Sequence, residues 1–223
     1  MYKTSSFILS GKTQLEQTKM NPLEIEVKFY ISNPSDLRQH ILELGAESQG
    51  RFFETNIRYE DSHNSFLQRE SILRLRKDRK ATLTFKSKSP DQNHEFKILR
   101  ELEVEVSDFK IMQNILEAIG FHEEQIYEKW RETLILKDLI FCIDTMPFGI
   151  FLEIEGKGNE IIESAQRLNL CWGHRILANY LSIFERIKTK FNLSFSDVTF
   201  ENFKPLGASF DHIIQSFQED QKN

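Results

Sequence analysis

Charged and apolar residues alternate along one segment of this chain after another, and the first clear example is EIEVKFY at 24–30. Successive side chains of a β-strand point to opposite faces, so Glu24, Glu26 and Lys28 share one face and the apolar residues share the other. Neighbouring carboxylates on one face lie about 7 Å apart and repel each other by roughly 2 kcal/mol at an effective dielectric constant of about 20. Cationic groups from other segments are therefore expected beside them.

The same alternation predicts further strands. We place them at 54–61, 72–78, 81–88, 101–107, 127–136, 139–144 and 150–158. In each strand the charged residues form a row along one face, which we call its polar file. These files contain, in chain order, Arg58, Arg74, Arg76, Lys86, Lys88, Glu101, Glu103, Glu105, Lys129, Arg131, Asp144, Glu153 and Glu155. A solvated sheet face usually mixes both signs of charge, whereas here whole strands are acidic or basic. The pattern therefore favours a face that binds a charged ligand over a face that only meets water.

This number of strands with one charged face predicts a closed sheet. Large sheets tend to curl or close, and closure would turn the charged face into a lumen. The opposite, apolar files are expected to pack against helices. They contain Ile25, Val27, Leu73, Leu75, Leu83, Phe85, Leu102, Val104, Leu152 and Ile154. The predicted fold class is α+β: a closed eight-stranded antiparallel β-barrel, or tunnel, with a charged lumen and flanking helices. An ordinary sheet with one solvated face is the alternative.

Helical patterns occur between these strands. The first, at 34–44, has Asn33 in the capping position, Pro34 in its first turn and Gly45 at its end. We expect further helices at 108–119, 159–169 and 174–190. The strand and helix that start at EIEVKF resemble those that start at ELEVEV, at 101–106, which suggests two halves related by a pseudo-two-fold axis.

The chain is expected to form one domain with two extensions. Residues 1–20 are polar and aperiodic and are predicted to form a disordered arm, so Met20 is a candidate start of translation. The barrel domain is placed at 21–190, and 191–223 form a C-terminal extension expected to pack partly on it. No segment has the length of apolar sequence that a membrane span needs.

Composition argues against several classes of function. The net charge is −5 and no basic block occurs, so neither nucleic acid nor a membrane is an expected partner. Cys142 and Cys171 are far apart in sequence, and the six histidines have no ligand spacing, so zinc is not expected. The sparse use of cysteine predicts a cytoplasmic protein.

The two signs of charge on the polar files suit two parts of one ligand. Clustered arginine and lysine side chains match phosphate oxygens, which arginine can bind in a bidentate manner. Clustered carboxylates match hard divalent cations such as Mg²⁺ or Mn²⁺. Together they predict a site for a polyphosphate and a divalent metal cofactor.

The motifs that carry these residues occur in the order and spacing of a known family. They are EIEVKF, LRLR, LTFKSK, RELEVEV, YEKWRE, IDTMPFG and FLEIEG. Over residues 22–190 the sequence thereby resembles the CYTH superfamily, also called triphosphate tunnel metalloenzymes. The resemblance implies an eight-stranded antiparallel tunnel that binds a triphosphate with Mg²⁺ or Mn²⁺. One departure occurs at Thr145, where related sequences often have glutamate.

The resemblance also implies roles for individual residues. The expected metal ligands are Glu24, Glu26, Asp144, Glu153 and Glu155. The expected phosphate ligands are Lys28, Arg58, Arg74, Arg76, Lys86, Lys129 and Arg131, among which Arg58 rests on the alternation more than on a family motif. The central acidic strand is expected to bind a second metal ion or to position basic residues, through Glu101, Glu103 and Glu105.

The activity that the resemblance implies is hydrolysis of a triphosphate, such as tripolyphosphate, thiamine triphosphate or ATP. Lys86, Glu26 and Arg76 are the expected catalytic residues, and the attacking water would be bound to the metal ion or oriented by Lys86. Two alternatives stay open at this point. One is a class IV adenylyl cyclase, which makes cyclic AMP and pyrophosphate from ATP, and the other is a non-catalytic binder of polyphosphate or nucleotide.

Overall fold

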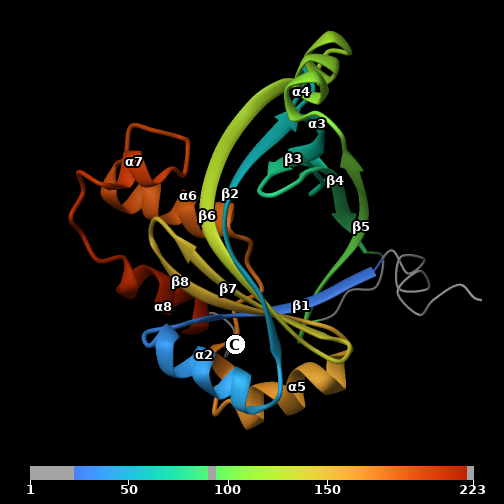
Figure 1. The fold of residues 1–223 in the computed structure, drawn as a ribbon. Coiled ribbons are helices and arrows are strands. Elements are labelled where there is room, and N and C mark those ends of the chain that lie inside the picture. Colours follow the sequence, from blue (N-terminus) through green and yellow to red (C-terminus); the bar gives the residue numbers. More distant parts are fainter. Residues whose placement is uncertain (1–22, 90–93, 220–223) are drawn as a thin grey trace, which may run out of the picture.

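Eight antiparallel strands close into a barrel in the computed structural model, which describes residues 23–89 and 94–219 (Figure 1). The strands are β1 (Leu23–Tyr30), β2 (Glu47–Glu60), β3 (Ile72–Lys77), β4 (Ala81–Lys88), β5 (Lys97–Val106), β6 (His122–Leu136), β7 (Leu139–Met146) and β8 (Gly149–Glu155). Their order around the barrel is β1-β5-β4-β3-β2-β6-β7-β8. The predicted fold class is therefore confirmed. The arm predicted at 1–20, including Met20, lies outside the described residues.

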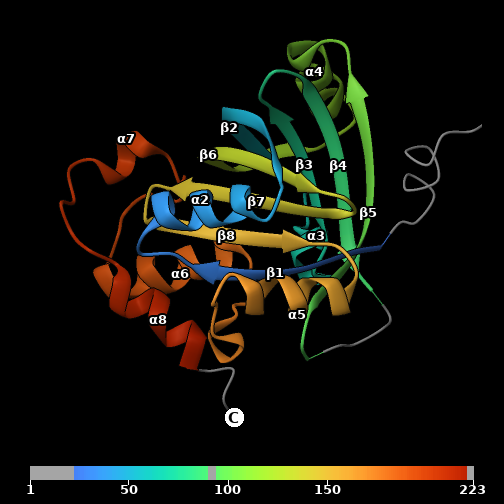
Figure 2. The same ribbon diagram turned by 60° about the horizontal axis from the view of Figure 1, so that its bottom comes forward.

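Helices lie around the barrel (Figures 1 and 2). They are α2 (Pro34–Glu43), α3 (Ser65–Gln68), α4 (Phe109–Ala118), α5 (Gly158–Arg167), α6 (Tyr180–Phe191), α7 (Phe200–Phe203) and α8 (Asp211–Glu219), with a 3₁₀ turn η1 (Trp172–His174). Asn33 caps α2 through its side chain, as expected, by accepting a hydrogen bond from the backbone N–H of Asp36. Among the residues described, no helix is both long and apolar enough to cross a lipid bilayer.

Strands β2 and β6 are longer than predicted. β2 begins at Glu47 rather than at residue 54, and β6 begins at His122 rather than at residue 127. The two strands pair with each other from Glu47 opposite Ile135 to Glu60 opposite His122. Because each strand supplies backbone partners to the other, segments with weak alternation of their own are held in the sheet.

The last predicted helix, at 174–190, begins later than expected. Ile176 is held in extended conformation because its backbone pairs with Lys28, with N···O distances of 3.2 and 2.7 Å. The helix α6 starts at Tyr180, where the Asn179 side chain accepts a hydrogen bond from the backbone N–H of Ser182. A tertiary pairing therefore overrides a helical sequence pattern.

The strand order agrees with the predicted internal symmetry. Exchanging β1 with β5, β2 with β6, β3 with β7 and β4 with β8 gives the same ring read in the opposite direction. Each half begins with a strand, a helix and a long strand, namely β1-α2-β2 and β5-α4-β6. This is the strand order that a pseudo-two-fold axis across the barrel would produce.

The helices do not cover the two sides of the barrel equally. On the side of β1, β7 and β8, helices α2 and α5 bury a continuous core that includes Val27, Ile41, Leu152 and Ile161 (Figure 2). On the side of β2 and β3, helix α4 buries a smaller cluster through Leu116. The helical layer is therefore thicker on the side of β1, β7 and β8 than on the side of β2 and β3.

One expectation about the outer face is wrong. Leu102 and Val104 on β5 were expected to pack against a helix, but they are 49% and 57% exposed. The position that α5 occupies after β8 corresponds by the internal symmetry to the connection between β4 and β5. The described residues of that connection contain no helix, so these two side chains are left uncovered.

The chain after α6 returns to the edge of β6. Val198 pairs with Tyr127 as an isolated bridge, and the backbone N–H of Phe200 donates to the Glu128 carboxylate at 3.0 Å. Phe203 joins Phe148 and other aromatic residues of α6 and β8 in a core of its own. This part of the chain thereby packs beside the β7–β8 turn.

Candidate functional site

The barrel encloses a cavity of about 1580 Å³, and the charged files of the strands line it. Inward positions alternate with outward ones along each strand, so the polar half of every alternating segment faces the cavity. All but one of the predicted site residues line it: Glu24, Glu26, Lys28, Arg58, Arg74, Arg76, Lys86, Glu101, Glu103, Glu105, Lys129, Arg131, Glu153 and Glu155. The exception, Asp144, is fully buried behind this surface.

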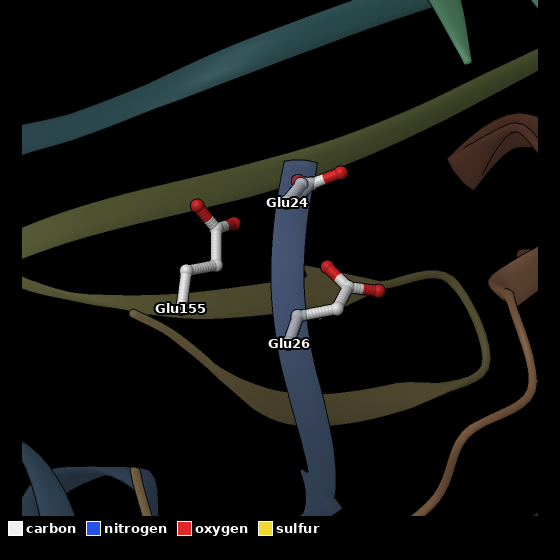
Figure 3. Close-up of side chains that lie close together, drawn as sticks. All are labelled: Glu24, Glu26 and Glu155. Carbon is white, nitrogen blue, oxygen red and sulfur yellow. The ribbon is translucent and has the colours of Figure 1, made fainter. Parts of the chain in front are cut away.

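Three carboxylates converge at one side of the cavity. Glu24 and Glu26 come from β1 and Glu155 from β8, and one oxygen of each lies within 4.8 Å of the others (Figure 3). The register explains the cluster, because Glu26 is directly opposite Glu155 in the sheet. Among the described residues this is the one group of three or more potential ligands that lie this close.

The protonation of the three carboxylates differs. Burial raises the pKa of Glu24 in spite of Lys86, and burial together with Glu24 raises the pKa of Glu155 to about 8. Burial acts in the same direction on Glu26, but Lys97 and Lys28 outweigh it and lower the pKa of Glu26 to about 2. An oxygen-rich cluster with mutual repulsion suits a hard divalent cation, which would replace the proton that the cluster otherwise needs. These residues therefore fit the expected metal.

Two other residues expected to bind metal have different surroundings. The Glu153 carboxylate pairs with Lys28 at 2.7 Å and with Arg131. The Asp144 carboxylate accepts from Lys129 at 2.8 Å, from Arg131 Nε at 2.7 Å and from the Tyr180 hydroxyl at 2.8 Å. Both carboxylates lie outside the three-carboxylate cluster, and their oxygens are already engaged by cations. Their position in the sequence motif does not distinguish the two situations.

Lys86 connects the acidic cluster to the central acidic strand. Its ammonium group lies 2.5 Å from a Glu24 oxygen and 3.3 Å from a Glu101 oxygen. Burial disfavours the charge, but Glu24 and Glu101 outweigh it and raise the pKa of Lys86. Lys86 is therefore a fixed positive charge beside the carboxylates and cannot act as a base near neutral pH.

The arginines on β2 and β3 pair less closely. Arg76 lies 3.6 Å from Glu103, Arg74 lies 3.9 Å from the same carboxylate, and Arg58 lies 3.5 Å from Glu124. Arg74 also donates to the Thr84 hydroxyl at 3.2 Å and to the Tyr127 hydroxyl at 3.3 Å. These guanidinium groups are held in the lumen without a tight ionic partner.

Two residues of the predicted files line the cavity but have side chains that are more than half exposed. Glu105 pairs with Lys80, and both side chains are more than half exposed. Lys88 pairs with Glu70 in the same exposed way. Of the three residues predicted on the acidic strand, Glu101 and Glu103 are therefore the ones that lie beside lumen cations.

Several polar residues of the site were not predicted. Lys97 pairs with Glu26 at 2.5 Å, and the buried Glu54 lies 3.7 Å from Lys129. Asn56 is fully buried on the same strand as Glu54. The alternation of β2 continues back from Arg58 through both positions, so the signal was present. Tyr180 lies within the helix predicted at 174–190, and its hydroxyl contact with Asp144 has no local sequence signal.

Comparison with known proteins agrees with this architecture. The family model of the CYTH domain matches residues 22–172. Similar solved structures include an adenylate cyclase candidate from Vibrio parahaemolyticus, with 18% identity and a TM-score of 0.66 over 74% of this chain and 99% of that one. The PH1012 protein from Pyrococcus horikoshii has 26% identity and a TM-score of 0.60 over 70% of this chain and 96% of that one.

HpAC1 from Hippeastrum is also similar. It is described as an adenylyl cyclase candidate with a dominant triphosphatase activity, and it has 18% identity and a TM-score of 0.51 over 73% of this chain and 95% of that one. No curated protein was found to match this sequence.

Proposed function

Because this chain belongs to the CYTH domain family, we propose that it is a metal-dependent enzyme that cleaves a triphosphate inside the barrel. The observation that carries the proposal is one cavity in which a three-carboxylate cluster lies across the barrel from the arginines of β2 and β3. A triphosphate needs both partners, since a divalent cation and basic side chains share its negative charge.

The carboxylates divide into two groups in this proposal. Glu24, Glu26 and Glu155 would hold the divalent ion, Mg²⁺ or Mn²⁺, which when bound neutralises charge on the phosphate oxygens. Asp144 and Glu153 would instead hold Lys129, Arg131 and Lys28 in the positions where they meet the substrate. Glu101 and Glu103 would orient Lys86 and the arginines of β3.

The basic residues would bind the phosphates and stabilise the charge that develops during cleavage. Arg74, Arg76 and Lys86 face the cavity from β3 and β4, and Lys28, Lys129 and Arg131 face it from β1 and β6. Lys86 keeps its proton, so its role is to donate a hydrogen bond to a phosphate oxygen or to the attacking water. Preorganised charge of this kind is usually the largest catalytic contribution in phosphoryl transfer.

The size of the cavity supports a substrate with an organic group as a second candidate. Its volume of about 1580 Å³ exceeds the range of about 300–1,000 Å³ that is typical of small-molecule sites. A nucleoside attached to the triphosphate would fit, and cyclisation of ATP by attack of a ribose hydroxyl is then the alternative reaction.

A product assay separates these reactions. The purified full-length chain is incubated with Mg²⁺ or Mn²⁺ and with tripolyphosphate, thiamine triphosphate or ATP in turn. Release of orthophosphate indicates hydrolysis, whereas cyclic AMP with pyrophosphate indicates cyclisation. Metal-dependent binding without any product would indicate a non-catalytic binding protein and would contradict the proposed catalysis.

A further inference from the structure

The lumen contains buried polar atoms that have no hydrogen-bond partner, and within the described residues all of them belong to β2 and β3. They are Glu54 Oε2, both amide atoms of Asn56, and the Nε atoms of Arg58, Arg74 and Arg76. We refer to these five residues as the β2–β3 wall. A buried polar atom without a partner typically costs about 1–3 kcal/mol, and such atoms are rare in native proteins. Six atoms on two adjacent strands therefore need an explanation.

Strand register places these atoms on one surface. Asn56 is directly opposite Arg76 of β3 and Tyr127 of β6, and Arg58 is opposite Arg74. Paired residues of an antiparallel sheet point to the same face, so the Asn56 side chain shares the inward face with these neighbours. Arg76 and Tyr127 line the cavity, and Asn56 lies between them with no exposed surface.

The chemistry of the wall matches an anion rich in oxygen. Three guanidinium Nε–H groups and the Asn56 amide are donors, whereas the Asn56 carbonyl oxygen and one Glu54 oxygen are acceptors. Phosphate oxygens would satisfy the donors, and a water molecule that accompanies the phosphate would satisfy the acceptors.

We propose that Asn56 is a ligand-binding residue, whose amide N–H donates to a phosphate oxygen of the triphosphate bound by Arg74 and Arg76. The inference rests on the proposed function and extends it to a neutral residue of β2. Arg76, which lies directly opposite Asn56, and Arg74 have no tight ionic partner, so both guanidinium groups are available to hold a phosphate beside the amide. The wall then completes its hydrogen bonds only when the ligand is present.

Replacement of Asn56 by leucine tests this, with Gln113 as a matched control. Gln113 is also a buried amide, but it lies on α4 and donates to Glu123 at 2.7 Å. Binding of tripolyphosphate with Mg²⁺ is measured by calorimetry, and the melting temperature is measured without ligand. We expect Asn56→Leu to weaken binding at least about tenfold while the ligand-free melting temperature stays equal or rises. Gln113→Leu should lower the melting temperature and change binding less than about twofold.

Two outcomes would overturn the inference. In one, Asn56→Leu binds tripolyphosphate as the wild type does; in the other, it lowers the ligand-free melting temperature as much as Gln113→Leu. Asn56→Asp serves as a second variant if the leucine variant does not fold, because it keeps the size and replaces the donor by a negative charge. It should bind tripolyphosphate even more weakly, and unchanged affinity would also overturn the inference. If the wild type itself does not bind tripolyphosphate, the proposed function fails instead.

Discussion

The two sides of the lumen differ in how closely their charges are paired. On β1, β7 and β8 the carboxylates of Glu26, Asp144 and Glu153 have cations within 2.5–2.8 Å. In the β2–β3 wall the shortest distances from Arg76 and Arg74 to a carboxylate are 3.6 and 3.9 Å. The outer layers follow the same division, because α2 and α5 cover the first side with a large core, whereas α4 and the short helix α3 bury a smaller cluster on the second.

This difference indicates two roles for buried charge in one barrel. Charges that are paired before a ligand arrives fix the shape of the lumen, and removing one member leaves the other buried without compensation. Charges that lack a tight partner remain available to the ligand, and their desolvation is offset only on binding. Asp144 and Glu153, which lie outside the metal cluster, should therefore affect stability strongly, and the side chains of the β2–β3 wall should affect binding.

Loss of Glu26, a member of the metal cluster, or of Lys86, which lies beside the cluster, should have the largest effect. Glu26→Ala and Lys86→Ala are each expected to lower turnover of the triphosphate by more than about 100-fold, since each removes preorganised charge from the reacting groups. Circular dichroism should report a folded protein in both cases. Lys190→Ala, an exposed change on α6, is the control. Near-normal turnover in both lumen variants would contradict the assigned roles.

Breaking the Asp144 network should cost the most stability. Asp144→Asn leaves Lys129 and Arg131 without their shared counter-charge in the interior, and such a loss typically costs about 3–5 kcal/mol. Urea unfolding measures the change in the free energy of unfolding. The matched variant is Asp138→Asn, whose side chain is 75% exposed and pairs with Lys157. It should leave stability almost unchanged. Equal effects of the two variants would show that the buried network does not stabilise the barrel.

Metal binding should depend on pH through Glu155. Its pKa of about 8 means that the metal-free cluster holds a proton at neutral pH, which a divalent cation must displace. Affinity for Mn²⁺ should therefore rise by up to about tenfold per pH unit between pH 6 and 8 and level off above that range. Calorimetry in buffers of different ionisation enthalpy should detect proton release near pH 7.

The raised pKa of Glu155 has an opposite consequence for the stability of the metal-free protein. A raised pKa favours folding below the ordinary carboxyl value of 4.5, and this contribution is lost as the pH rises through about 8. Glu155→Gln should remove both the proton release and this loss of stability. Proton release that persists in the Gln variant would assign the proton to another group.

Alternation along the strands was sufficient to predict the barrel and most of its lining. A period of two fixes which side chains share a face, and strongly charged files such as Arg74 and Arg76 are conspicuous in the sequence. Asn56 was missed because an uncharged residue does not stand out in such a file, although its position follows the same period. The face of the strand on which a side chain lies is thus a local property that the sequence reveals.

The partner of a charged side chain, and the presence of a helix over an apolar one, are not local properties. Asp144 is engaged by Tyr180 from a helix far along the chain, so its motif could not show that its oxygens are already occupied. Likewise, the apolar file of β5 fixes the outward direction of Leu102 and Val104 but not whether a helix lies over them. Both depend on which elements meet in three dimensions.

The smallest expected effect tests the difference between covered and uncovered side chains on the outer face of the barrel. Val27 and Val104 are outward valines on the first strand of each half, but Val27 is fully buried and Val104 is 57% exposed. Valine to threonine keeps the β-branched shape and adds a hydroxyl, so the change isolates the cost of burying a polar group. Val27→Thr should lower the free energy of unfolding by about 1–3 kcal/mol, whereas Val104→Thr should change it by less than about 0.5 kcal/mol. A substantial loss in Val104→Thr would mean that β5 is covered after all, and the division between a thick and a thin side would not hold.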